Sequence, residues 1–86
     1  YDENNGILPN HTGELIDLCK RHQIKCPKFV FYEKTNEFVC ESLVQLHGEI
    51  LKTTALHKKK KDARKLASKA MIKLLVELKL SGDEIN

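Results

Sequence analysis

Several features are missing from this sequence, and each absence excludes a class of protein. No apolar run is long enough to cross a bilayer, and nothing resembles a secretory signal. Only three cysteines are present, an odd number that argues against a disulfide framework and for a reducing compartment. There are no internal repeats, and the single low-complexity tract is the lysine run Lys58–Lys61. We therefore expect an intracellular protein of the cytoplasm or nucleus, with no membrane partner.

Catalytic and metal-binding patterns are also lacking. No Ser/His/Asp or Cys/His arrangement, acidic metal cluster or phosphate loop can be assembled, so this segment is not expected to be an enzyme. The spacing Cys19-x-x-His22-x-x-x-Cys26 is compatible with a zinc site, with Cys40 or His47 as a fourth ligand. The alternative is favoured, because Cys19 and Cys40 fall on apolar stripes and are typical small core residues. The sequence thus predicts no metal and no cofactor.

Length and charge predict one small domain with a basic face. The chain has 86 residues and a formal net charge of +3, so it is only mildly basic overall. Acidic residues collect at Tyr1–Glu3 and Asp83–Glu84, which leaves the middle of the chain more basic than its ends. We expect a flexible segment over 1–9, the domain over 10–80 and a tail over 81–86. Because the chain does not begin with Met, we also expect it to be part of a longer protein.

The positive charge is concentrated in Lys58–Met71, which starts as a lysine run and continues as an amphipathic helix. The apolar stripe of this helix is predicted to be Ala63, Leu66, Ala67, Ala70, Leu74 and Leu78. Lysines near a helix amino end oppose the helix dipole, which favours anions there. The cluster therefore indicates a site for a polyanion, at which lysines and helix end contact the same phosphates. A solvated basic face or a nuclear-import patch is the alternative interpretation.

The rest of the chain predicts one further helix and three strands. Asn10 or Thr12 is a suitable cap for a helix from about Gly13 to His22, and Pro27 ends the helical register. The apolar face of this helix is predicted to be Leu15, Leu18, Cys19 and His22. Strands are expected over Lys28–Glu33, Glu37–Gln45 and Glu49 to about Ala55, with turns at Thr35-Asn36 and His47-Gly48.

The last helix should run to Lys79 or Leu80, where Ser81-Gly82 ends it. The predicted fold class is α+β, with the order α-β-β-β-α and two helices packed on one face of a three-stranded antiparallel sheet.

This order, with Lys60-Lys61-x-Ala63-Arg64 opening the last helix, resembles the double-stranded-RNA-binding domain (dsRBD) family. The resemblance extends from about Asn10 to Leu78. It includes the small residues that follow the basic motif, the Pro27-x-Phe29 entry to the first strand and the Phe38 of the second. Leu18-Cys19 and Lys59–Arg64 look most like the domains of Dicer-partner proteins. The resemblance implies a non-catalytic module of an RNA-processing or RNA-silencing protein, with a Dicer-like nuclease or another dsRBD protein as possible partners.

The resemblance also implies which residues contact RNA. Lys60, Lys61 and Arg64 match the phosphate clamp, and Lys58, Lys59 and Lys65 would be auxiliary. In the family, polar groups of the first helix reach one minor groove, and Asp17 and Asn10 occupy matching positions here.

The sequence departs from the family pattern at both minor-groove contacts. The first hairpin turn lacks the family's Gly-Pro-x-His, and Ile16 stands where a Gln is usual. The Gly-x-Gly-x-Ser run before the last helix is replaced by Ala55–Lys59, which removes the usual cap. Binding is therefore expected to depend on charge.

A protein-interaction module with weak or no RNA binding is the alternative function. The sheet face away from the helices is predicted to carry an apolar patch of Val30, Tyr32, Val39 and Leu43. A contiguous apolar group on an open face is typical of a docking surface.

Overall fold

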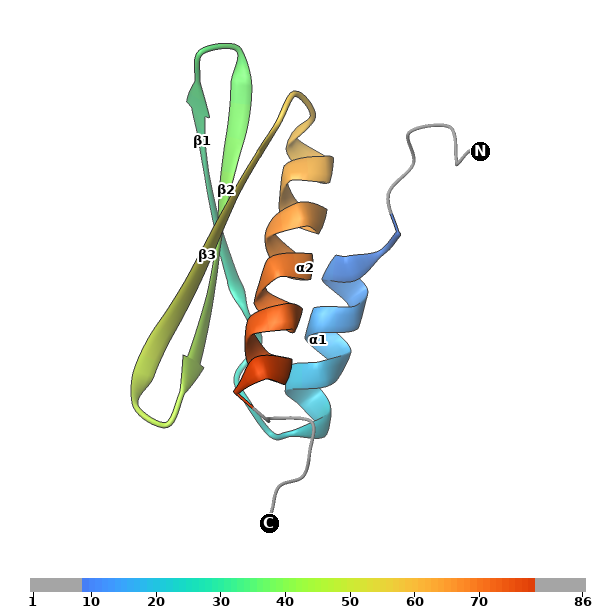
Figure 1. Ribbon diagram of the computed structural model, residues 1–86, viewed down its shortest axis with the longest axis vertical. Coiled ribbons are helices and arrows are strands. Elements are labelled where there is room, and N and C mark those ends of the chain that lie inside the picture. Colours follow the sequence, from blue (N-terminus) through green and yellow to red (C-terminus); the bar gives the residue numbers. More distant parts are fainter. Residues whose placement is uncertain (1–8, 79–86) are drawn as a thin grey trace.

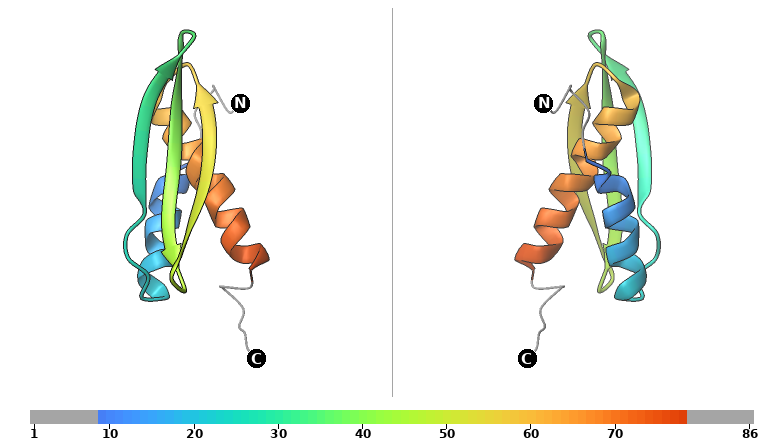
Figure 2. Two further views of the ribbon diagram at one scale, coloured as in Figure 1. Left: turned by 90° about the vertical axis from the view of Figure 1, so that its left-hand side faces the viewer. Right: turned by 90° about the vertical axis from the view of Figure 1, so that its right-hand side faces the viewer.

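The computed structural model describes residues 9–78 and has two helices on one side of a three-stranded sheet (Figure 1). Its elements are α1 (His11–Arg21), β1 (Lys28–Lys34), β2 (Glu37–Leu46), β3 (Glu49–His57) and α2 (Lys60–Glu77). The strands are antiparallel in the order β1-β2-β3, and both helices cover the same face (Figure 2). The predicted α-β-β-β-α fold is confirmed. The flexible segment expected before Pro9, the tail over 81–86 and the Ser81-Gly82 stop lie outside the described residues.

The first helix begins at His11, two residues before the predicted start at about Gly13, because Asn10 is its N-cap. The Asn10 Oδ1 accepts a hydrogen bond of 3.0 Å from the Gly13 N–H. Leu15, Leu18 and Cys19 are buried as predicted. His22 is exposed, and its predicted place on the apolar face is wrong. The helix ends at Arg21, so the backbone at His22 leaves the helical path and directs its ring to solvent.

Two tight turns determine the register of the sheet. Thr35 and Asn36 have φ values of 49° and 65°, and His47 and Gly48 have 54° and 81°. Consecutive left-handed residues are typical of two-residue hairpin turns, and a β-branched residue such as Thr35 rarely adopts this conformation. The turns align Phe31 with Cys40 across β1 and β2. All three predicted strands are present, and each extends slightly beyond its predicted end.

The core-facing side of α2 differs from the predicted stripe. The buried apolar residues follow four-residue steps, Ala63, Ala67, Met71 and Leu75. Leu78 is 52% exposed, so its predicted burial is wrong, and Leu66, Ala70 and Leu74 are only partly buried. The helix ends at Glu77, before the predicted end at Lys79 or Leu80.

Small residues allow the amino-terminal half of α2 to lie close to the sheet. Ala63 and Ala67 pack with Cys40 in one cluster, against which Phe31 and Phe38 also pack. The Thr53 hydroxyl donates a 2.8 Å hydrogen bond to the Ala67 carbonyl. A second cluster joins α1, β2 and the carboxyl-terminal half of α2, and it contains Leu15, Leu18, Cys19, Val44, Met71 and Leu75.

The three cysteines differ in burial. Cys19 and Cys40 are completely buried, as predicted for core residues, whereas Cys26 is exposed. Burial raises the pKa of the Cys40 thiol to about 11. The pKa of the Cys19 thiol is also raised, mainly by burial and to a smaller extent by the charge of the nearby Cys26. Because the thiolate is the reactive form, iodoacetamide at neutral pH should modify Cys26 alone in the folded protein. Mass spectrometry measures this directly. Modification of Cys40 at a similar rate before denaturant is added would contradict the packing described here.

Candidate nucleic-acid interface

The lysine run lies at the amino end of α2, at the same end of the molecule as the β1–β2 turn (Figure 1). All four side chains of Lys58–Lys61 are exposed. Lys59 is the N-cap residue and makes no side-chain hydrogen bond to the first turn. The run is thus displayed at a helix end whose outward N–H groups favour negative charge.

His57 organises this helix end, a role that sequence analysis missed. Its Nδ1 accepts a 3.0 Å hydrogen bond from the Lys59 N–H, and the Asp62 Oδ2 lies 3.9 Å from the same nitrogen. Asp62 is buried in the first turn, where a carboxylate is favoured by the helix dipole. The acidic side chain therefore points inward while the lysines point outward. A histidine two residues before an N-cap has no recognised capping pattern, so the sequence offered no signal for it.

The three residues of the predicted clamp do not share one environment. Lys61 is exposed, whereas Lys60 places its Nζ 4.7 Å from the centre of the Phe31 ring in a cation–π contact. Arg64 is half-buried beside Cys40, and its Nε is buried with no hydrogen-bond partner among residues 9–78. The β1 ring thus positions the Lys60 ammonium at the edge of the cluster.

A row of lysines continues from the cluster along α2, and its second half was missed in the sequence. Lys61, Lys65, Lys69 and Lys73 are spaced by four residues, which places them on one helix face. Lys69 and Lys73 are exposed, and Lys65 is half-buried. At 1.5 Å per residue the row is about 18 Å long. The four-residue spacing was the available signal.

The polar residues predicted on α1 are separated from the cluster. The start of α1 lies beside the middle of α2, where the Thr12 and Ser68 hydroxyls are 3.3 Å apart. Ser68 is seven residues beyond Lys61, so this contact lies about 10 Å along the α2 axis from the cluster. Asn10, at the start of α1, is exposed, although its Oδ1 is used by the cap.

Asp17 lies further away. It lines a groove of about 420 Å³ together with Arg21 of α1 and with Ile72 and Val76 of α2. The Ile72 position is eleven residues beyond Lys61, or about 16 Å along the helix axis. The structure therefore groups Lys58–Lys61 at one end and does not bring Asp17 to them.

Over residues 9–78, no three His, Cys, Asp or Glu side chains converge where they could hold a metal ion. Neither helix of this part is long and apolar enough to cross a membrane.

A comparison of the chain with protein-family models finds no match, and a search of curated proteins finds none either.

Proposed function

We propose that this domain binds double-stranded RNA as a non-catalytic module of an RNA-processing or RNA-silencing protein. The observation that supports this most directly is the exposed run Lys58–Lys61 at the amino end of α2, continued by the lysine row along that helix. Such an array neutralises closely spaced phosphates, and a duplex presents phosphates in regular rows.

The shape of A-form RNA explains why a rigid α-β-β-β-α domain suits this task. The major groove of RNA is narrow and deep, so side chains cannot read bases there, but phosphates line both of its edges. A lysine cluster can bridge these phosphates while a second element of the domain reaches a neighbouring minor groove. The start of α1, about 10 Å from the cluster along α2, is the element placed to do so. This arrangement also accounts for the resemblance to the dsRBD family.

The minor-groove contacts are weak in this chain. The β1–β2 connection consists only of Thr35 and Asn36, and Ile16 cannot hydrogen-bond a 2′-hydroxyl. Affinity should therefore depend mainly on phosphates, which duplex DNA also offers. We expect a smaller preference for RNA over DNA than a domain with both minor-groove contacts would show.

Titration of a labelled RNA duplex, followed by competition, tests this function. Unlabelled duplex RNA should compete best, duplex DNA less well and single-stranded RNA least. Changing the base sequence of the duplex should have little effect. The absence of measurable binding to duplex RNA at low salt would reject the proposal.

The lysine row yields a graded prediction. Replacing Lys69 and Lys73 by alanine should weaken duplex RNA binding less than changes at the amino end of α2, because these residues extend the cluster along the helix. Each lost phosphate contact should also reduce the slope of log affinity against log salt by about 1. Binding measured over a salt series checks both effects. An unchanged slope would restrict the RNA interface to the helix end.

The open face of the sheet, defined as the face away from the helices, supports protein interaction as the second candidate function. Tyr32, Val39 and Leu56 form one cross-strand apolar row, and Val30 lies beside it. Val30, Tyr32 and Leu56 are 44%, 46% and 48% exposed. A Dicer-like nuclease or another dsRBD protein is the kind of partner that the resemblance suggests.

The structure corrects the composition of the predicted patch. Val39 is only 2% exposed, because its cross-strand neighbours cover it, so it cannot form part of a docking surface in the way predicted. Glu41 lies between Val30 and Thr54 and accepts a hydrogen bond from the Tyr32 hydroxyl. Leu43 is thereby separated from the Tyr32 row. The variant Val30→Lys with Leu56→Lys tests this face without burying a charge, and unchanged partner binding would reject it.

A further inference from the structure

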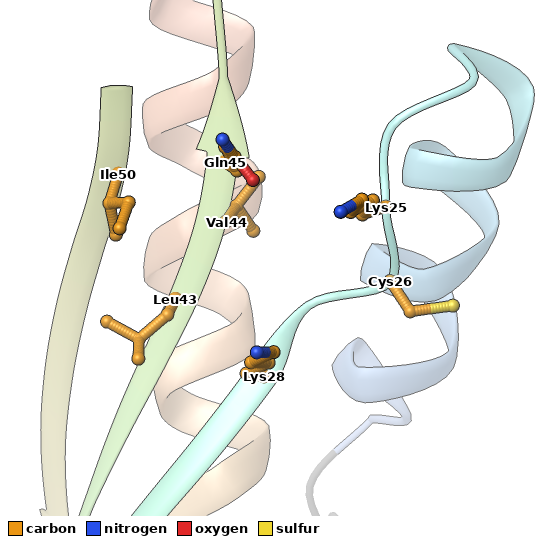
Figure 3. Close-up of a pocket in the computed structure, with 7 residues that line it drawn as sticks. All are labelled: Lys25, Cys26, Lys28, Leu43, Val44, Gln45 and Ile50. Carbon is orange, nitrogen blue, oxygen red and sulfur yellow. The ribbon is translucent and has the colours of Figure 1, made fainter. Parts of the chain in front are cut away.

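The end of the open face near the β2–β3 turn contains a pocket where the sheet is incomplete. β1 pairs with β2 only as far as Lys28 and Leu43, whereas β2 continues to Leu46 and remains paired with β3. Pro27 lies directly before β1 and is buried. The chain turns away toward α1 at this point. A pocket of about 260 Å³ occupies the space where β1 would have continued (Figure 3).

The base of the pocket is apolar and its rim is basic. Leu43, Val44 and Ile50 line it, and Ile50 is 70% exposed. Lys25 lies across the gap from β2, and Lys28 lies at the end of β1 (Figure 3).

A third lysine stands close to this rim. Lys52 is the cross-strand neighbour of Leu43 on the side opposite Lys28, so an exposed lysine flanks Leu43 on each neighbouring strand. The carboxylate of Glu41, one row away, is engaged by the Tyr32 hydroxyl. The rim is therefore positively charged, around a pocket with room for one or two apolar side chains.

Backbone groups also point into this space. Successive residues of a strand direct their N–H and C=O groups to alternate sides. Leu46 pairs with Glu49 next to the two-residue turn, so the N–H and C=O groups of Leu46 point toward β3. The N–H and C=O groups of the preceding residue, Gln45, therefore point to the other side of β2, toward the missing part of β1. An extended segment placed there would meet backbone donors and acceptors as a strand does.

We infer that this pocket binds an extended acidic segment of a partner protein, with one large apolar side chain inserted between Leu43 and Ile50. Carboxylates beside the inserted side chain pair with Lys25, Lys28 and Lys52. The pocket lies at the opposite end of β2 from Phe38, which aligns with His57 near the lysine run, so this interaction is independent of the proposed RNA binding.

A phage-displayed library of random linear peptides, selected against the whole domain, identifies a probe. The enriched peptides should combine acidic residues with a large aliphatic or aromatic residue. A labelled copy of the best peptide is then titrated against wild type and three variants. Ile50→Lys, and Lys25→Glu with Lys28→Glu, should each weaken binding by about tenfold or more, since the first blocks the pocket and the second reverses its rim charge.

Lys34→Glu is the control for a reversed charge outside the pocket, because Lys34 is an exposed lysine at the other end of β1, and it should leave peptide affinity unchanged. All substituted side chains are exposed, and thermal melts should show folded variants. Failure to enrich any peptide over the Ile50→Lys variant, or enrichment without acidic residues, overturns the inference. A loss of duplex RNA affinity in the Lys25→Glu, Lys28→Glu variant with peptide affinity unchanged also overturns it, and assigns these lysines to RNA.

Discussion

Replacing Lys60 and Lys61 together by alanine should weaken duplex RNA binding by more than about tenfold, because a hydrogen bond to a charged group contributes about 1.5–3 kcal/mol. Lys61 is exposed at the amino end of α2, and Lys60 is held beside it by the Phe31 ring. Both ammonium groups can therefore face one row of phosphates. Fluorescence anisotropy with a labelled RNA duplex measures the loss.

The fold should tolerate this double substitution. Loss of the cation–π contact to Phe31 destabilises the fold by about 0.5–1 kcal/mol. Removal of two cations from a helix amino end stabilises it by a similar free energy, because the helix dipole disfavours positive charge there. The melting temperature should thus change little, so weaker binding would not result from unfolding.

A control variant separates a specific cluster from general attraction. Lys28→Ala with Lys52→Ala removes the same charge from the part of the open face that flanks Leu43, away from both helices (Figure 2) and from the lysine run. Its RNA affinity should remain close to that of wild type at moderate salt. An equal loss in both double variants would mean that net charge alone causes binding, and the cluster at α2 would then have no special role.

Sequence reasoning predicted the elements well, because local chemistry determines them. Asn10 is a good helix cap, and Asn36 and Gly48 tolerate the left-handed conformation of tight turns. Side chains alternate between the two faces of a strand, so the register set by the turns also determines which residues face the helices. Phe29 and Phe31 face the helices, and Val30 and Tyr32 face away from them, as predicted.

The finer environment of the site could not be predicted in this way, because it depends on tertiary packing. The rotation of α2 against the sheet selects Leu75 rather than Leu78 for burial, although both are leucines at plausible helical spacing. The same rotation places Lys60 over the Phe31 ring, and no ring contact of this kind could be read from the lysine run itself. The pocket at Leu43 depends on where β1 stops, and a sequence gives strand ends less clearly than strand centres.

The rotation of α2 can be tested with two equal substitutions in one helix. Leu75→Ala should lower the free energy of unfolding by about 2–5 kcal/mol, because it removes a fully buried side chain and leaves a cavity. That is a large part of the roughly 5–15 kcal/mol by which domains are stable, so the variant should be partly unfolded at moderate temperature.

Leu78→Ala is the matched control, since the same atoms are removed from a side chain that is 52% exposed. Surface substitutions usually change stability by less than about 0.5 kcal/mol, and this one should fall in that range. Urea denaturation followed by circular dichroism gives both values on one scale. The opposite ranking, with Leu78→Ala the more damaging, would restore the stripe predicted from the sequence. The lysine row on the other side of α2 would then rotate with it, and the proposed RNA-binding face would have to be reassigned.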